Sequence, residues 1–172
     1  MNKLLAAFVL PVVVIGVMVG SALSAPAQAD AVTRQLLLKI SNIQFGSFTC
    51  LIGSLDTSCL LASVPVVAPA TSNLSVGTGT FQSTITIDFT PGGTCNIVDE
   101  PGVFIFDNGM IFTHSHHEDC NIHGLRIDTT FQVTGGAGAF SGATGSGREF
   151  GAVSGSAQSA HNPVIWVGSI SF

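Results

Sequence analysis

The sequence QVTGGAGAFSGATGSG occupies residues 132–147 and admits two structural interpretations. In dinucleotide-binding domains a glycine-rich turn follows a strand and leads directly into a helix, whose N-terminal amides hold a pyrophosphate. Here the residues after Gly142 include Gly145 and Gly147, each of which costs a helix about 1 kcal/mol relative to alanine. We therefore interpret the tract as a turn between two strands and not as a cofactor loop.

Phe140 is a lone bulky side chain among the small residues of this tract, so we expect it to close one end of the core. Tight turns and bulges favour glycine because it accepts positive φ angles without a steric cost. The residues expected to shape this structural turn are Gly135, Gly136, Gly138, Phe140 and Gly145.

Alternation of apolar and polar residues with a period of two recurs along the chain, and the period of an amphipathic helix is almost absent. The apolar residues Leu125, Ile127, Phe131 and Val133, for example, fall on one face of a single strand. Segment 60–72 contains two prolines and several alanines, and we expect it to be a loop with one short strand at most. Strands are expected at 32–40, 43–49, 81–89, 102–106, 110–117, 125–134, 147–157 and 164–172.

One-sided alternation indicates antiparallel sheets with one buried face, arranged as an up-and-down barrel or as a sandwich. A closed barrel leaves no unpaired strand edge, and open edges are an aggregation hazard for a β protein with only 9% charged residues. We therefore predict an all-β single domain, an antiparallel β-barrel of about eight strands.

The N-terminal residues have the three-part composition of a secretory signal peptide: Lys3, an apolar run over 4–19, and small residues up to Ala29. The alternative is an uncleaved membrane anchor, against which Pro11 and the small-residue site argue. We predict a signal peptide at 1–29 and a β-barrel domain at 30–172. The protein is then secreted or periplasmic, with no membrane association after cleavage.

The charge balance of the predicted mature chain is acidic, with only Arg34, Lys39, Arg126 and Arg148 as basic residues against ten acidic ones. A nucleic-acid partner requires clustered Lys and Arg to neutralise phosphates, so this balance excludes that class of partner.

All four cysteines lie in the predicted exported part, where an even number indicates two disulfides. Asn108-Gly109 predicts a hairpin with a type I′ turn in which Asp107 faces Met110, which would bring the strand before it close to the last cysteine. A turn at 53–56 would likewise join the first two cysteines. The predicted pairs are Cys50–Cys59 and Cys95–Cys120.

The stretch THSHHEDCNIH at 113–123 holds four of the five histidines. On a strand, His114 and His116 share a face whereas His117 points to the other. Two histidines at this spacing can reach one metal ion, with His123, Glu118 or Asp119 as a further ligand. The metal hypothesis therefore names His114, His116 and His123 as ligands for Zn or Cu. The alternative is a solvated polar surface, and no other cofactor is expected.

Two pairs of adjacent carboxylates, Asp99-Glu100 and Glu118-Asp119, are the remaining candidates for acid–base chemistry. Adjacent residues of a strand point to opposite faces, so neither pair is expected to act as paired catalytic acids. We expect both pairs in charged loops. The sequence also lacks the G-x-S-x-G elbow of a serine nucleophile, and no catalytic residue is assigned.

The segment GGAGAFSGATG at 135–145 resembles the G-G-T-G-x-F-x-x-A-x-G segment of the allene oxide cyclase and dirigent barrel families. It is closer still to the TGGTGRFAGATGSG tract of small secreted bacterial proteins related to those families. It departs at Ala137, where Thr is usual, and at Ala139, where the bacterial proteins often have Arg. The resemblance extends over 125–157 and is only architectural elsewhere. It implies an eight-stranded antiparallel barrel without a cofactor, often assembled into dimers or trimers.

These observations favour a secreted, non-enzymatic β-barrel that is structural or binds a small apolar ligand. A homo-oligomer is compatible with this interpretation. The alternative is an enzyme of the allene oxide cyclase or dirigent type, which acts by confining a reactive apolar intermediate. A further alternative is a metal-binding exported protein that uses the cluster from His114 to His123. A roomy barrel interior with a few convergent polar groups would favour a carrier or an enzyme over a structural role.

Overall fold

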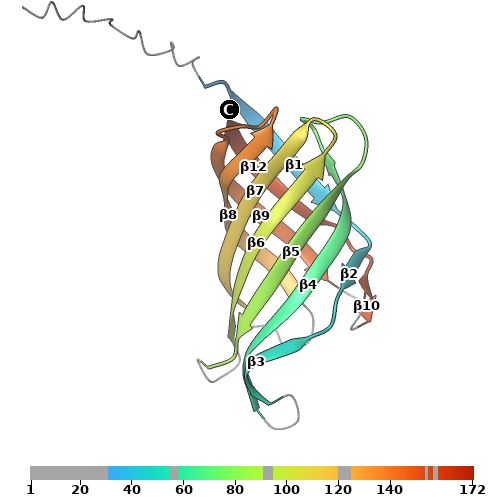
Figure 1. The fold of residues 1–172 in the computed structure, drawn as a ribbon, viewed down its shortest axis with the longest axis vertical. Helices are drawn as coiled ribbons and strands as arrows, with labels where there is room; N and C mark the ends of the chain where they lie inside the picture. The colour runs from blue at the N-terminus through green and yellow to red at the C-terminus, as the bar shows by residue number, and fades with distance from the viewer. Residues whose placement is uncertain (1–30, 55–57, 91–94, 120–124, 154, 157–158) are drawn as a thin grey trace, which may run out of the picture. The chain divides into compact units, whose positions relative to one another are not determined.

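The computed structural model describes residues 31–54, 58–90, 95–119, 125–153, 155–156 and 159–172. Within these ranges the regular structure is entirely β (Figure 1). The strands are β1 (Thr33–Ile40), β2 (Ile43–Phe45), β3 (Thr49–Ser54), β4 (Ser58–Ser72), β5 (Gly79–Asp88), β6 (Asn96–Phe106), β7 (Gly109–Asp119), β8 (Leu125–Gly138), β9 (Thr144–Val153), β10 (Gly155–Ser156), β11 (Ser159–Ala160) and β12 (Val164–Ser171).

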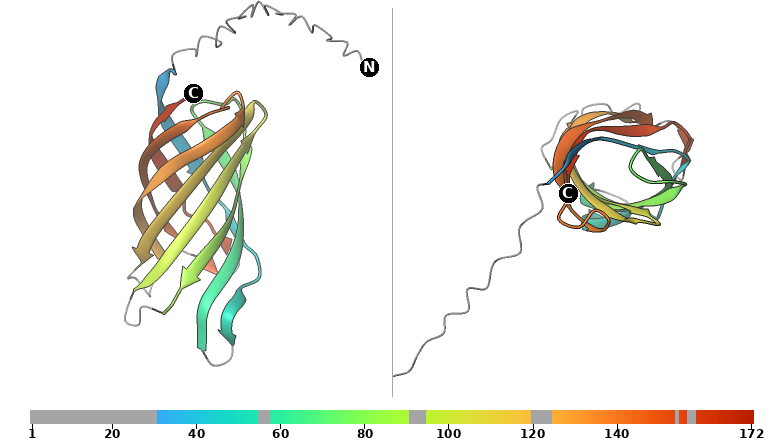
Figure 2. Two further views of the ribbon diagram at one scale, coloured as in Figure 1. Left: turned by 60° about the vertical axis from the view of Figure 1, so that its left-hand side comes forward. Right: turned by 90° about the horizontal axis from the view of Figure 1, so that it is seen from above.

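The long strands form one closed antiparallel barrel, which confirms the predicted fold class. The ring runs β1, β12, β9, β8, β7, β6, β5 and β4, and pairing of Lys39 with Thr71 in β4 closes it. The end-on view in Figure 2 shows this ring. β3 pairs with β4 outside the ring, and β2, β11 and β10 continue the sheet from β4. All pairings that the described strands make are antiparallel.

The alternating pattern of the strands places their apolar residues inside the barrel, as the last strand illustrates. In β12, Val164, Trp166 and Ile170 are at most 2% exposed, whereas Val167 between them is 43% exposed. Phe131 and Val133 of β8 are buried in the same way. Since every strand of the ring contributes one face to a common interior, the whole domain has a single core.

The expectation of a loop at 60–72 was wrong, because this segment lies within the 15-residue strand β4. Its inward face consists of Ala62, Val64, Val66, Ala68 and Ala70. The two prolines fit because their carbonyls point away from β5: Gly46 donates to the Pro65 oxygen at 2.7 Å and Ser41 to the Pro69 oxygen at 3.3 Å. The N–H that each proline lacks would face that same side, so the ladder with β5 loses nothing.

The hairpin between β6 and β7 forms, but its register differs from the expected one. Phe106 pairs with Gly109, so the connecting residues are Asp107 and Asn108, and Asp107 does not face Met110. Asn108 does not adopt a positive φ, so the turn is not the expected type I′. Several other strands also differ in length from their predictions: β6 starts at Asn96, and segment 43–49 divides into β2 and the start of β3.

The glycine-rich tract forms the end of β8, a turn, and the start of β9. Gly138 and Gly142 have φ angles of 65° and 75°, a region that favours glycine. The Ser141 N–H donates to the Gly138 carbonyl at 3.1 Å, and the Ala143 N–H donates to the Phe140 carbonyl at 3.0 Å. The chain then enters a strand and not the helix that a pyrophosphate would need.

The end of the barrel next to this turn is packed with aromatic rings. Phe140 is 1% exposed and its ring meets that of Phe172 edge-on at 5.3 Å. Deeper inside, Phe81, Phe104 and Trp166 form a three-membered cluster with centroid distances of 4.7, 5.5 and 5.1 Å. We call Phe81, Phe104, Phe106 and Trp166 the aromatic plug.

One predicted disulfide, Cys50–Cys59, is present and joins β3 to β4 with a Cα–Cα distance of 5.7 Å. The second, Cys95–Cys120, stays a prediction because Cys120 lies outside the described residues. The last described pair before it is Asn96 with Asp119, one position from each cysteine. The predicted signal peptide also lies outside the described residues. Within the described ranges, no helix is long and apolar enough to cross a membrane.

Phe140→Ala is expected to lower the free energy of unfolding by about 3–5 kcal/mol, because it leaves a cavity at the end of the core. Phe150→Ala is the control, since Phe150 lies on the outer face of β9 and is 41% exposed. Its cost should stay below about 1 kcal/mol. Urea denaturation of both variants measures the difference, and equal losses would contradict the role assigned to Phe140.

Candidate functional site

The interior beyond the aromatic plug is hollow. A cavity of about 520 Å³ lies there, a size within the range of small-molecule sites. Trp166 forms the boundary, because its ring packs against Phe81 and Phe104 and the residue also lines the cavity. The other lining residues are Ile40, Ile43, Phe45, Gly46, Ser47, Phe48, Val64, Val66, Ile85, Ile87, Val98, Glu100, His117, Ile127, Glu149 and Val164.

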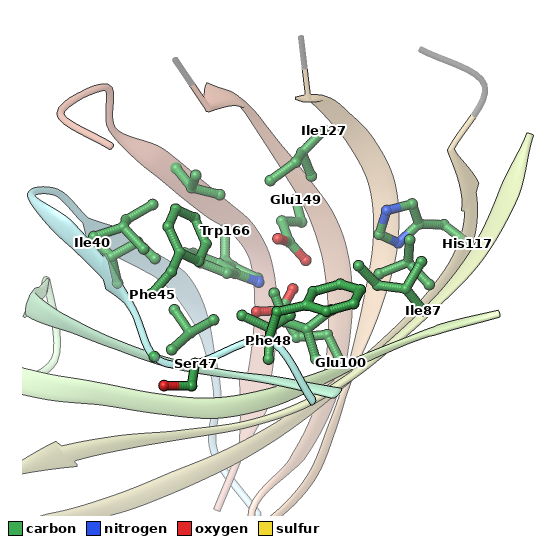
Figure 3. Close-up of a pocket in the computed structure, with 17 residues that line it drawn as sticks. Ile40, Phe45, Ser47, Phe48, Ile87, Glu100, His117, Ile127, Glu149 and Trp166 are labelled. Carbon is green, nitrogen blue, oxygen red and sulfur yellow. The ribbon is translucent and has the colours of Figure 1, made fainter. Parts of the chain in front are cut away.

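The segment between β2 and β3 covers one side of the cavity (Figure 3). Gly46 sets the position of this segment, because its N–H donates a hydrogen bond to the Pro65 carbonyl. Gly46 also has no side chain, and this leaves room for the proline ring: a Cβ at Gly46 would lie 3.1 Å from the Cβ of Pro65. Phe45 and Phe48, on either side of Gly46 in the sequence, are thereby placed against the cavity. Phe48 is 42% exposed and its ring lies 6.4 Å from that of Phe89, so it lies at the rim of the cavity.

Two glutamates, one from β6 and one from β9, point into this largely apolar space (Figure 3). Glu100 is 9% exposed and Glu149 is 1% exposed. Their position follows from strand alternation. Glu100 shares the inner face of β6 with Val98 and Phe104, and Glu149 lies between the outward residues Arg148 and Phe150.

Burial raises the pKa of both carboxyl groups, because a carboxylate is poorly solvated in an apolar interior. The pKa of Glu100 lies well above its usual range, first through burial and then through repulsion by Glu149, while Ser83 acts in the opposite direction. Burial raises the pKa of Glu149 to about 7, although Ser115 and Trp166 partly oppose this shift. The pair therefore holds protons at pH values at which ordinary glutamates are ionised.

The carboxyl group of Glu149 has unused hydrogen-bonding capacity. Neither of its oxygens has a hydrogen-bond partner of normal geometry among the described residues. Ser115 and Trp166 lie near enough to influence its pKa, but neither completes such a bond. A buried polar atom in this condition is costly, and the cost falls when a ligand supplies the missing partner.

The expectation that Asp99-Glu100 is a charged loop was wrong, since both residues lie in β6. The inference that the two side chains diverge was correct: Asp99 is on the outer surface and Glu100 lines the cavity. Glu118-Asp119 likewise belongs to β7. Sequence reasoning missed Glu149 altogether. A signal existed, because Gly147, Glu149 and Gly151 share one face of a strand, and Arg148 and Phe150 take the other face.

The histidines divide between the two faces of β7 as expected. His114 Nε2 and His116 Nδ1 lie 2.7 and 3.3 Å from the same oxygen of Asp99, on the outer surface. Partial burial would raise the pKa of Asp99, but these two histidines outweigh it and lower the pKa. His117 lines the cavity, and His123 lies outside the described residues.

The metal hypothesis is therefore untested for its full ligand set. Within the described ranges, no group of three potential ligands is arranged to hold a metal ion. The hypothesis predicts stoichiometric Zn²⁺ binding in isothermal titration, lost in the double variant His114→Ala/His116→Ala and kept in His161→Ala, a histidine outside the cluster. Absence of stoichiometric binding, or unchanged binding in the double variant, would reject it.

The buried carboxyl groups predict that the free energy of unfolding decreases as the pH rises. Because the folded pKa of Glu149 is about 7 and exceeds the ordinary value of 4.5, its proton stabilises the folded state. The free energy of unfolding should fall as the pH rises from about 4.5 to about 7, by up to about 3 kcal/mol from this group.

Urea denaturation of the wild type and of Glu149→Gln between pH 4 and pH 8 measures this effect. The variant should lose much of the decline, whereas Glu118→Gln, at an exposed position of β7, should keep it. A stability that rises with pH over this interval in the wild type, or an unchanged slope in Glu149→Gln, would contradict the burial of an unmatched carboxyl group.

Comparison with known proteins agrees with the fold and adds no assignment of family. No protein-family model matches the chain, and no curated protein matches it. Among solved structures, the pterocarpan synthase dirigent protein GePTS1 has a TM-score of 0.52 at 13% identity, covering 83% of this chain and 89% of that one. A pyocyanin demethylase has a TM-score of 0.45 at 15% identity, covering 78% of this chain and 98% of that one. At such identities the likeness to the dirigent protein concerns the fold alone.

Proposed function

We propose that this protein binds a small, mostly apolar molecule inside the barrel. The observation that carries the proposal is the cavity of about 520 Å³, with apolar walls and the two carboxyl groups of Glu100 and Glu149. A purely structural barrel gains stability by filling its interior, because side chains that face a void lose packing contacts. The open half of the barrel, lined by Val66, Ile85 and Ile127, lacks the stability that a filled interior would provide.

The division of the interior also supports a binding function. The aromatic plug closes one half of the barrel, so a ligand would rest against Trp166. The polar groups around the cavity are few, and Glu100 and Glu149 converge closely enough for one to raise the pKa of the other. Few convergent polar groups in an apolar concavity are typical of sites that orient a small molecule.

Guidance of a reactive apolar intermediate is a second candidate function, and it would use the same cavity. The specific observation in its favour is the Glu100–Glu149 pair, since a carboxyl group whose pKa is about 7 can give or accept a proton near neutral pH. The fold shared with a dirigent protein is compatible with this function. Analysis of a bound compound by mass spectrometry distinguishes the two, because a carrier returns it unchanged and an enzyme converts it.

We also propose that the protein acts outside the cytoplasm. The Cys50–Cys59 disulfide supports this location, because structural disulfides form and persist mainly in oxidising compartments. The signal-peptide composition of residues 1–29 supports it independently.

The binding function predicts an outcome for one pair of neighbouring variants. Val66 points into the cavity and is 2% exposed, whereas Val67 points outward and is 46% exposed. Val66→Phe partly fills the cavity and should weaken binding of Nile red, a neutral apolar dye, about tenfold, while Val67→Phe should leave it unchanged.

Dye fluorescence measures the affinity, and circular dichroism verifies that both variants are folded. Trp166, the only tryptophan of a chain without tyrosine, gives a second readout, because a ligand against its ring changes its emission. If the wild type does not bind the dye, or if both folded variants bind it equally well, the cavity is not the binding site.

A further inference from the structure

We propose that the ligand of this cavity is a lipophilic amine, whose ammonium group lies between Glu100 and Glu149 while its apolar part contacts the cavity wall. The inference rests on the proposed binding function and names the chemical class of the ligand. It is carried by two features of the cavity: an unmatched pair of acids, and the carboxyl oxygens of Glu149, which have no hydrogen-bond partner of normal geometry among the described residues.

The acids are unmatched because the cavity offers them no fixed cation. Among the described residues that line it, none is lysine or arginine. The titratable groups that face it are Glu100 from β6, His117 from β7 and Glu149 from β9. The nearby Asp128 and Arg148 pair with each other on the outer surface and do not supply a charge to the interior. A positive charge brought by the ligand would therefore meet two acids and at most one imidazole.

The hydrogen-bonding groups of the site select for a donor. Neither oxygen of Glu149 has a hydrogen-bond partner of normal geometry among the described residues, although the side chain is only 1% exposed and Ser115 and Trp166 lie close to it. Ionised carboxylates accept hydrogen bonds and do not donate them, and an ammonium group carries up to three donors and no acceptor. Charge-assisted bonds of this kind are about twice as strong as neutral ones. An ammonium group would thus satisfy the oxygens that the fold leaves unused.

Trp166 forms an aromatic wall beside the acids. Its ring lines the cavity next to the acids, and the plug residues Phe81 and Phe104 hold it in place (Figure 3). The remaining walls, such as Val66, Ile85 and Ile127, offer only apolar contact, so the rest of the ligand is expected to be hydrocarbon or aromatic.

The opposite charge is disfavoured by the same groups. A carboxylate ligand would meet Glu100 and Glu149 and could bind only if both remained protonated, whereas a neutral alcohol would gain the apolar contacts without the ion pair. The predicted order of affinity is amine above alcohol, and alcohol above carboxylate.

Isothermal titration with 2-naphthylmethylamine, 2-naphthylmethanol and 2-naphthoate tests this order, since the three compounds share one apolar part. At pH 8 we expect the amine to bind at least about tenfold more tightly than the alcohol. The double variant Glu100→Gln/Glu149→Gln keeps the shape of both side chains and should remove this preference, while Glu118→Gln should keep it.

The dependence on pH gives a second readout. Because Glu149 must lose its proton to pair with the ammonium, and its pKa is about 7, the affinity for the amine should rise about tenfold between pH 6 and pH 8. The affinity for the alcohol should not rise over that interval. Both effects should disappear in the folded double variant.

The outcomes separate the two proposals. If the alcohol binds as tightly as the amine, or if the double variant keeps the preference for the amine, the amine proposal is wrong and the binding function stands. If neither Nile red nor any of the three naphthyl compounds binds to the wild type, both proposals are wrong.

Discussion

Closure of the sheet into a ring is the constraint on which the other features of this protein depend. Pairing of β1 with β4 at Leu38–Ser72, Lys39–Thr71 and Ile40–Ala70 fixes the number of strands around the interior, and that number limits its width. Within a space of fixed width, the size of the inward side chains decides whether a level of the barrel is packed or hollow. Phe81, Phe104 and Trp166 fill one half. Valine and isoleucine side chains leave the other half open.

The hollow half explains how two acids can occupy the interior of a barrel with so few charges. A tightly packed core would leave Glu100 and Glu149 no means of exchanging protons or partners, and a buried unmatched carboxyl group is costly there. Facing a cavity, the acids can hold protons in the free protein and give them up when a ligand brings compensating charge. In the proposed function, the same cost that makes this pair unfavourable for stability would make it selective for a ligand.

The sequence predicted the barrel because alternation with a period of two is a local property. The strand around Phe131 and the one around Trp166 follow it plainly, and Phe140 stands out in its tract. The prediction of a loop in place of β4 was wrong because prolines are rare within strands. Only the pairing geometry of Pro65 and Pro69 shows that this strand accommodates them. The cavity was not predictable, because its volume depends on which inward side chains meet across the ring. The roles of Glu100 and Glu149 were not predictable for the same reason, because they come from β6 and β9 and meet only across the closed barrel.

A carbon-13 NMR titration of the glutamate side chains tests the central claim most directly, because the chain contains only Glu100, Glu118 and Glu149. We predict that the carboxyl carbons of Glu100 and Glu149 titrate clearly above the ordinary glutamate value of 4.5, with Glu149 changing near pH 7. If the carboxyl carbons of Glu100 and Glu149 instead titrate near pH 4.5, the buried acid pair does not exist and the binding site proposed for this barrel is wrong.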